Sequence, residues 1–415
     1  MALRRKAKAT FIVCMFLVFA FQEMGEAAEW WASPSIMVRR DYDDNINLST
    51  TPVSSVSSTW VAPRLDFGIA SNIWKVYGGA AFTSRRFPGH SELDSDAQYL
   101  TFGSSYMTER NIWQLDAASS KTSYFTAQVP SSDIVLFTQN TDSDTKNVTP
   151  TWTWLITELT QLQLTYSVSD VSYVNGESVG LYDYRNSSLS AKLSHQLDID
   201  TQIFLLPVYS VLRVPGTTSE TKTTSYQVGI ARTFSETMKG TLSVGGRDTS
   251  SEREVLVCKL FLGPLCLQTA QETISNRDSG SVYSANLEKQ FETVRLNAAA
   301  SRSYYPSANG QLVITDSASF SLSRPFTAKL TGKLDTQAYN YNYKNSSQTV
   351  GVSSANDFKV YYIKPSLHWQ WAPEWYLDSG YRYTYVQRAS ETSAATSNVV
   401  YLTLAYQWPK ISISR

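Results

Sequence analysis

The chain has 415 residues, in which 36 basic side chains balance 36 acidic ones. This balance excludes the strongly basic surface of a nucleic-acid-binding protein, so nucleic acid is not expected as a partner. Twenty-five tyrosines and 11 tryptophans accompany a mean hydropathy of −0.25. This combination favours strands that meet lipid with alternate residues over the core of a soluble sandwich.

A secretory leader is predicted at the start of the chain. Arg4, Arg5 and two lysines precede an apolar run over residues 11–21, which is too short to span a bilayer as a helix. The small residues that follow predict cleavage after Ala27, with Ala28 as the alternative. Residues 1–27 are therefore expected to be a signal peptide, and residues 28–415 a single exported domain.

Period-two alternation dominates the rest of the chain. No later segment holds about 20 consecutive apolar residues, so we expect no transmembrane helix. Apolar and polar residues instead alternate as in a strand with two different faces, most clearly over 61–69, 161–168 and 400–408. The last segment resembles the terminal strand that the barrel-insertion machinery reads, although residues 409–415 follow it. Pro207, inside the apolar run 203–212, predicts a local irregularity or a strand end.

Short and long connections alternate along the chain. The short ones lie near Ser71, Glu109, Glu158, Asp198, Glu236, Glu292, Phe326 and Pro373. The long polar ones lie around 49–56, 85–95, 122–146, 173–180, 213–220, 250–276, 306–309, 342–354 and 390–397. Short periplasmic turns and longer extracellular loops are typical of outer-membrane barrels. We therefore expect an all-β fold: a single transmembrane antiparallel up-and-down β-barrel of about 18 strands, within a range of roughly 16 to 20.

Three short segments resemble a known family. Residues 41–48 read Asp-Tyr-Asp-Asp-Asn-Ile-Asn-Leu, residues 62–65 read Ala-Pro-Arg-Leu, and residues 408–412 read Trp-Pro-Lys-Ile-Ser. They are similar to segments of the β-barrel porin 2 family and of its relatives that accompany exopolysaccharide or PEP-CTERM export systems. The resemblance implies an outer-membrane pore, often linked with export of an extracellular polysaccharide, and it implies no catalytic residues.

The acidic segment at 41–48 has two readings. The first is a strand end whose acidic residues enter an extracellular loop. The second is a cation site, because Asp43, Asp44 and Asn45 supply the hard oxygen ligands that calcium prefers, although their spacing is not that of an EF-hand.

The inner face of the barrel is where a function is expected, since about 18 strands leave an aqueous channel unless loops fill it. Assigning the face opposite each apolar row predicts a lumen lined by Arg64, Asp66, Asp116, Lys192, Lys239, Arg247, Glu288, Arg295, Lys329, Lys333, Asp335, Lys364, Asp378 and Arg382. Its excess of basic residues favours anionic solutes or an anionic polymer. The alternative is that Arg64 with Asp66, Lys333 with Asp335, and Asp378 with Arg382 neutralise one another.

Cysteine, tryptophan and histidine add three smaller expectations. Cys258 and Cys266 bracket a short segment, so an oxidising compartment favours a disulfide between them over two free thiols. Six tryptophans near strand ends fit an interfacial girdle better than sugar-stacking platforms: Trp113, Trp152, Trp154, Trp369, Trp371 and Trp375. The three histidines, His90, His195 and His368, belong to no nucleophile or metal-ligand motif, so neither an enzyme nor a cofactor is expected.

These observations lead to two candidate functions in the bacterial outer membrane. The first is a pore for export of an extracellular polysaccharide or for passage of hydrophilic solutes, with membrane lipid, periplasmic polysaccharide-export proteins and a polysaccharide as partners. The second is a structural or adhesive surface barrel with a closed lumen, in which the loops at 122–146 and 250–276 make the contacts.

Overall fold

A computed structural model describes most of the chain beyond the expected leader. The described residues are 28–51, 55–124, 141–176, 181–215, 219–262, 265–306, 312–344 and 357–414. The predicted leader lies outside these residues, so its cleavage after Ala27 stays a prediction. Among the described residues, no helix is both long and apolar enough to cross a membrane.

The described chain consists of strands and one short 3₁₀ helix, η1 (Ser91–Leu93). The strands are β1 (Glu29–Asp43), β2 (Val56–Ala70), β3 (Trp74–Arg86), β4 (Ser95–Met107), β5 (Asn111–Tyr124), β6 (Thr141–Leu155), β7 (Thr160–Tyr173), β8 (Tyr184–Asp198), β9 (Thr201–Arg213), β10 (Glu220–Ser235), β11 (Met238–Leu262), β12 (Leu265–Gln290), β13 (Arg295–Pro306), β14 (Leu312–Pro325), β15 (Leu330–Lys344), β16 (Phe358–Gln370), β17 (Trp375–Arg388), β18 (Ala395–Gln407) and β19 (Ile411–Ser414).

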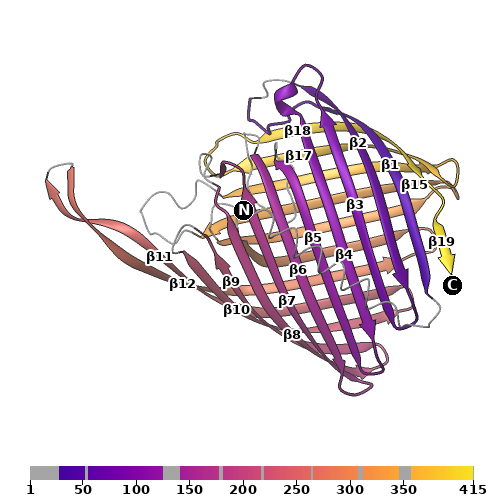
Figure 1. The fold of residues 1–415 in the computed structure, drawn as a ribbon, viewed down its shortest axis with the longest axis horizontal. Coiled ribbons are helices and arrows are strands. Elements are labelled where there is room, and N and C mark those ends of the chain that lie inside the picture. The colour runs from indigo at the N-terminus through magenta and orange to yellow at the C-terminus, as the bar shows by residue number, and fades with distance from the viewer. Residues whose placement is uncertain are drawn as a thin grey trace, which may run out of the picture.

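All strands pair antiparallel in one sheet that closes on itself, because β1 pairs with β2 on one edge and with β18 on the other. The short β19 continues β18 along the same edge of β1, where Ile411 lies opposite Ala32 and Ser414 opposite Glu29. The wall therefore has 18 strands, as predicted. The residues after Trp408, which depart from the usual terminal signal, lengthen this seam: the amide of Trp408 donates to the carbonyl of Pro34 at 3.1 Å, and Figure 1 shows β19 at the rim.

Eight tight turns join the strands at one end of the barrel, which confirms the predicted short connections. Four of these turns begin with a serine or threonine whose hydroxyl accepts the amide three residues later: Ser71, Thr108, Thr157 and Thr327. Such hydroxyls mimic a backbone acceptor and stabilise tight turns. Both described chain ends lie at this end of the wall, which is the periplasmic end in an outer-membrane barrel.

The longest hairpin corrects one predicted loop. Residues 250–276 were expected to form a loop, but most of them extend β11 and β12, which pair with each other from Met238 and Lys289 to Leu262 and Leu265. Figure 1 shows this hairpin projecting from the extracellular end of the barrel. In the backbone ladder Cys258 lies opposite Thr269 and Cys266 opposite Phe261. The two cysteine side chains lie outside the described part, so the disulfide stays a prediction.

Prolines interrupt the ladder without ending strands. Pro207 lies inside β9 and stays paired with Tyr226 of β10, but two pairs with β8 are missing beside it. Similar two-residue gaps occur beside Pro63, Pro150 and Pro365. A proline lacks the amide proton that the ladder needs, so the expected irregularity is local and the strand continues.

Two extracellular loops and the neighbouring strand ends form apolar clusters. Leu48, in the loop between β1 and β2, packs on Val313, Tyr341, Val360 and Val386 of β14 to β17. A second cluster joins Leu181 and Val214 to the ends of β7, β8 and β9. Because Leu48 reaches strands that are not neighbours of its own hairpin, its loop folds across the concave side of the wall and narrows the extracellular end.

Candidate functional site in the lumen

The register and the long-range contacts together identify the lumen face. Residues directly opposite each other on paired strands share a face, so Asp41, Arg64 and Tyr401 can be followed from strand to strand around the wall. Side chains on this face contact each other across an intervening strand, as Arg85 of β3 does with Asp41 of β1 and Tyr77 of β3 with Asp116 of β5. The loop residue Leu48 also clusters with side chains on this face of four successive strands, β14 to β17. One side chain can lie against four strands of a closed wall only on its concave side, so this face is the lumen.

The opposite face is apolar and carries aromatic belts near the periplasmic turns. Trp113 and Trp152 stack with ring centroids 5.4 Å apart, and Trp154 follows at 6.2 Å. Trp371, Trp375, Tyr406 and Trp408 form a second belt on β16 to β18. All six tryptophans assigned to a girdle point outward, at the depth where aromatic rings meet the lipid interface.

A closed wall satisfies every strand edge, and its outer face meets lipid rather than water. The chain is an outer-membrane β-barrel.

The most ordered part of the lumen is a row of alternating cations and rings. The guanidinium of Arg39 lies 4.3 Å from the ring of Tyr401 and 5.3 Å from that of Trp60, and the guanidinium of Arg85 lies 4.5 Å from Trp60 and 4.4 Å from Phe87. Lys364 continues the row with its ammonium 5.5 Å from Tyr401. We call Phe87, Arg85, Trp60, Arg39, Tyr401 and Lys364 the stacked row. Cation–π contacts fix the orientation of each cation.

Two buried carboxylates hold the stacked row in place. Asp41 accepts a hydrogen bond from Nε of Arg39 at 2.5 Å and lies 3.8 Å from Nη2 of Arg85, and its side chain is only 4% exposed. Asp43 accepts from the hydroxyl of Ser397 and from the amide of Asn45. Arg382 lies close enough for electrostatic interaction with both carboxylates, and its Nε has no hydrogen-bond partner among the described residues. Three cations thus gather around two carboxylates.

The predicted lumen residues fall into three groups. Lys364 belongs to the stacked row itself. The lumen face beside the row carries Lys333, Asp335 and Arg382, with Asp335 opposite Lys364 and Lys333 opposite Ser366. Asp378 also faces the lumen there, but it pairs with His368 at 2.6 Å instead of with Arg382. Arg64 and Asp66 form the two-point ion pair expected under the neutralisation alternative, with both distances 2.7 Å.

The remaining predicted residues are spread around the wall. Lys239 pairs with Glu288 at 2.9 Å, Lys192 lies 4.5 Å from the ring of Phe204, and Nε of Arg295 donates to Gln290 at 3.0 Å. Arg247 is buried against Asp278 at 2.5 Å and Thr249, so it is not open to the channel. Lys329 lies in a periplasmic turn, where its ammonium donates to the carbonyl of Trp371, and this places it at the mouth and not on the wall.

Sequence reasoning missed the centre of the stacked row. Arg39, Trp60, Arg85 and Tyr401 were not assigned to the lumen. Asp41 was treated as part of a strand end, and Asp43 as part of a strand end or as a cation ligand. The alternation of side chains along β1 could have placed Arg39 and Asp41 in the lumen. On this strand, one face carries Ser33, Ser35, Met37, Arg39 and Asp41, and the other carries Pro34, Ile36 and Val38. The predicted closed barrel implies that its first and last strands pair, but not the register that places Asp41 opposite Tyr401.

The opposite side of the lumen has a different chemistry. From Ser143 to Thr153 on β6 and from Gln161 to Ser169 on β7, every inward side chain bears a hydroxyl or an amide. Neighbouring hydroxyls pair across the strands, as Thr151 does with Thr165 at 3.3 Å and Thr149 with Ser167 at 3.2 Å. We call the inward face of β6 and β7 the hydroxyl face.

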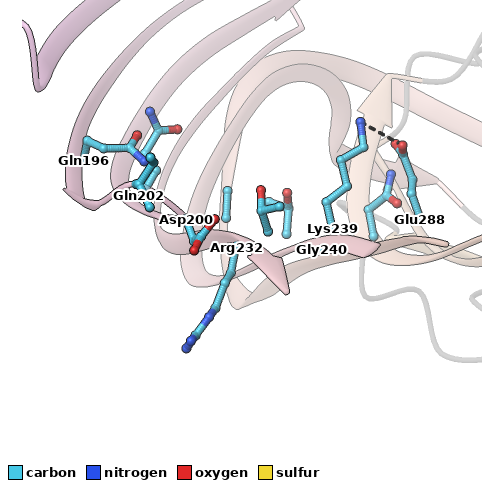
Figure 2. Close-up of a pocket in the computed structure, with 12 residues that line it drawn as sticks. Gln196, Asp200, Gln202, Arg232, Lys239, Gly240 and Glu288 are labelled. Atoms are coloured by element: carbon cyan, nitrogen blue, oxygen red, sulfur yellow. Dashed lines mark ion pairs between the residues drawn. The ribbon is translucent and has the colours of Figure 1, made fainter. Parts of the chain in front are cut away.

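A polar pocket of about 290 Å³ lies at the periplasmic end of β8 to β12. Gln196, Gln202, Lys239 and Glu288 line it, and Figure 2 shows the Lys239–Glu288 ion pair on the opposite side of the wall from the side chain of Arg232. The pocket is therefore continuous with the polar inner face and has no nucleophile with an adjacent base among its lining residues.

The acidic segment after β1 is used for hydrogen bonding. Asp44 accepts from the amide and the side chain of Asn398, and Asp43 accepts as described above. These contacts support the strand-end reading. Within the described ranges, no group of three or more histidine, cysteine, aspartate and glutamate residues is arranged to hold a metal ion.

Several solved outer-membrane proteins share the barrel architecture at low similarity. Pseudomonas aeruginosa OccK9 (OpdG) is 11% identical with a TM-score of 0.46, and the alignment covers 91% of this chain and 98% of that one. The ferric-catecholate import receptor Fiu from E. coli K12 is 9% identical with a TM-score of 0.48, over 90% of this chain and 81% of that one. No protein-family profile and no curated protein matches the chain.

Proposed function

We propose that this barrel is a pore that passes hydrophilic solutes across the outer membrane and prefers anions. The observation that carries the proposal is the exposure of charged side chains on the inner face: Arg64 is 56% exposed and Lys239 is 66% exposed, although both point into the barrel. Charged groups with this exposure inside a closed wall need water around them, which supports a hydrated path through the lumen.

The stacked row supports the preference for anions. Arg39, Arg85 and Arg382 lie around Asp41 and Asp43, and Lys364 lies on the ring of Tyr401 beside them. Aromatic rings hold Arg39, Arg85 and Lys364 in fixed positions. Fixed cations on the wall of a pore favour anions. Carboxylates on nearby strands, such as Asp335 and Asp378, keep the preference moderate.

Export of an acidic polysaccharide is the finer form of this proposal. The resemblance to barrels of exopolysaccharide export systems suggests it. The two sides of the lumen support it, since fixed cations can pair with carboxylates of a polymer while the hydroxyl face exchanges hydrogen bonds with its sugar hydroxyls. Periplasmic export proteins would then be the partners that supply the polymer.

A closed surface barrel is the second candidate, and one observation favours it. The loop between β1 and β2 is pinned across the extracellular end: the guanidinium of Arg388 donates to the carbonyl of Leu48 at 3.0 Å, and the side chain of Asn45 donates to the carbonyls of Ser49 and Thr396. A second loop packs inward at Leu181. If these loops seal the lumen, the projecting hairpin of β11 and β12 would carry the function.

Single-channel recording of the refolded barrel in a planar bilayer distinguishes the candidates. We expect steady conductance with a higher permeability for chloride than for potassium, and block by acidic oligosaccharides but not by neutral ones of equal length. A folded barrel without conductance would contradict the open pore and favour the surface barrel. Conductance without block by acidic oligosaccharides would keep the pore and remove the polysaccharide from the proposal.

A further inference from the structure

Three strands end at the periplasmic rim with the same pair of outward-facing side chains, a basic residue and a phenylalanine. On β10, β12 and β14 a basic residue is followed two positions later by a phenylalanine on the same side of the strand: Arg232 and Phe234, Lys289 and Phe291, and Arg324 and Phe326. The cations lie 5.9, 5.6 and 5.9 Å from the respective ring centroids. We call these six residues the basic–phenylalanine rim.

Glycines on the neighbouring strands let two of the rings lie against the wall. A Cβ atom added at Gly240 would lie 3.1 Å from the ring of Phe234, and one added at Gly332 would lie 2.5 Å from that of Phe326. The same packing therefore occurs twice, at β10 with β11 and at β14 with β15. It presses the ring of each phenylalanine onto the backbone of the next strand.

The rim faces away from the channel. Figure 2 shows the side chain of Arg232 pointing away from Lys239 and Glu288, which lie on the lumen side. Phe234, Phe291 and Phe326 are each about half exposed, as expected for rings that meet lipid in place of protein. The rim therefore lies on the lipid side of the wall, beside the periplasmic turns.

The three cations lack acidic partners. Among the described residues none of them forms a salt bridge: Lys289 donates to the hydroxyl of Thr237 at 2.9 Å, and Asp198 interacts with Arg232 only electrostatically, over a longer distance. Outward residues beside the other turns include neutral side chains such as Trp154, Asn111 and Ile203. The outward positive charge at this depth is thus concentrated on β10 to β14.

We propose that the basic–phenylalanine rim binds the phosphate headgroups of anionic phospholipids in the periplasmic leaflet. The rings enter the boundary between headgroups and acyl chains, and the long basic side chains reach back to the phosphates. Anionic lipid attracts each basic side chain near the membrane surface with about 1 kcal/mol, or about fivefold in affinity. Three cations over alternate strands form one continuous site for such headgroups.

Native mass spectrometry of the refolded barrel titrated with phosphatidylglycerol tests the proposal, with phosphatidylcholine as the neutral lipid. We expect the wild type to retain phosphatidylglycerol preferentially. We expect the triple variant Arg232→Gln, Lys289→Gln, Arg324→Gln to bind it on the order of 10- to 100-fold more weakly and to keep its affinity for phosphatidylcholine. Heat-modifiable migration on a gel checks that each variant is folded.

A matched variant removes the same charge at the other end of the wall. Arg185, Arg213 and Lys222 also face outward on neighbouring strands, but near the extracellular loops. Their triple replacement by glutamine should leave phosphatidylglycerol binding unchanged. Equal loss in both triple variants would show a general charge effect and overturn the proposal. Unchanged binding in the rim variant, or displacement of the lipid by millimolar inorganic phosphate, would overturn it as well.

Discussion

The two sides of the lumen are built in different ways. The stacked row joins residues from β1, β2, β3, β16 and β18, and Asp41 contacts two of its arginines at once. On the hydroxyl face of β6 and β7, each contact joins two neighbours on adjacent strands. A shared buried carboxylate couples several side chains, whereas paired hydroxyls act one pair at a time. Substitutions in the first region should therefore have larger and less additive effects than those in the second.

Asp41→Asn should have the largest effect. It removes the charge that two arginines share at a site that is 4% exposed, and an uncompensated buried charge typically costs about 3 kcal/mol or more. We expect the urea midpoint of the barrel to fall accordingly. Asp66→Asn is the control, because its ion pair with Arg64 is exposed and should be worth less than about 1 kcal/mol. Equal losses in the two variants would remove the distinction between a shared carboxylate and a simple pair.

Gly380→Val should have the next largest effect on stability. Even a Cβ atom at this position would lie 2.5 Å from the hydroxyl oxygen of Tyr401, so the ring must move away from Arg39 and Lys364. We expect a loss of about 1–3 kcal/mol in thermal unfolding, as for other overpacked sites, together with a weaker preference for anions. Gly246→Ala is the control, since the nearest atom to an added Cβ, the carbonyl oxygen of Gly280, would lie 3.9 Å away. If anion preference is unchanged in Gly380→Val, the stacked row does not set selectivity.

Lys364→Gln should change permeation more than stability. Its ammonium stacks on Tyr401 without a salt bridge among the described residues, so we expect the chloride-to-potassium permeability ratio to fall by about threefold. Lys329→Gln provides the comparison, because Lys329 lies in a turn and bonds a carbonyl. Reversal potentials in a salt gradient measure both. A larger change in Lys329→Gln would place the selective region at the periplasmic mouth.

The smallest effect is expected for the double variant Thr151→Val, Thr165→Val. It replaces both partners of one hydroxyl pair by side chains of the same shape, which leaves no donor or acceptor unpaired. We expect a change below about 0.5 kcal/mol and an unaltered single-channel conductance. A marked loss of stability would show that the hydroxyl face is coupled like the stacked row.

Local information in the sequence was sufficient for the wall. The turn near Ser71 and its equivalents follow from neighbouring residues, and eight such turns lead directly to the 18 strands. The alternation of side chains along each strand also depends only on neighbouring residues. It placed Arg64 and Lys239 on the same side of the wall as the other polar residues. These predictions depend on a few consecutive residues, so no knowledge of the closed fold was needed.

Side-chain contacts between distant parts of the chain could not be predicted. A closed barrel implies that the first and last long strands pair, but not the register that brings Arg39 to Tyr401. Leu48 reaches Val386 only because its loop folds inward. The extension of β11 and β12 was missed for another reason. Residues 250–276 are rich in polar side chains. Beyond the barrel wall, β11 and β12 do not separate lipid from water, so their side chains need not alternate between apolar and polar, and no period-two pattern predicts the strands.

The seam between β1 and β18 has a consequence for biogenesis. Every other pair of neighbouring strands is joined by a single connection, but Ser35 meets Gln407 only after the whole intervening chain has crossed the periplasm. Pairing over such a separation is entropically the most demanding and is expected to form last. The four residues of β19 then lengthen this last pairing along β1, so this short strand contributes to the closure of the sheet into a barrel.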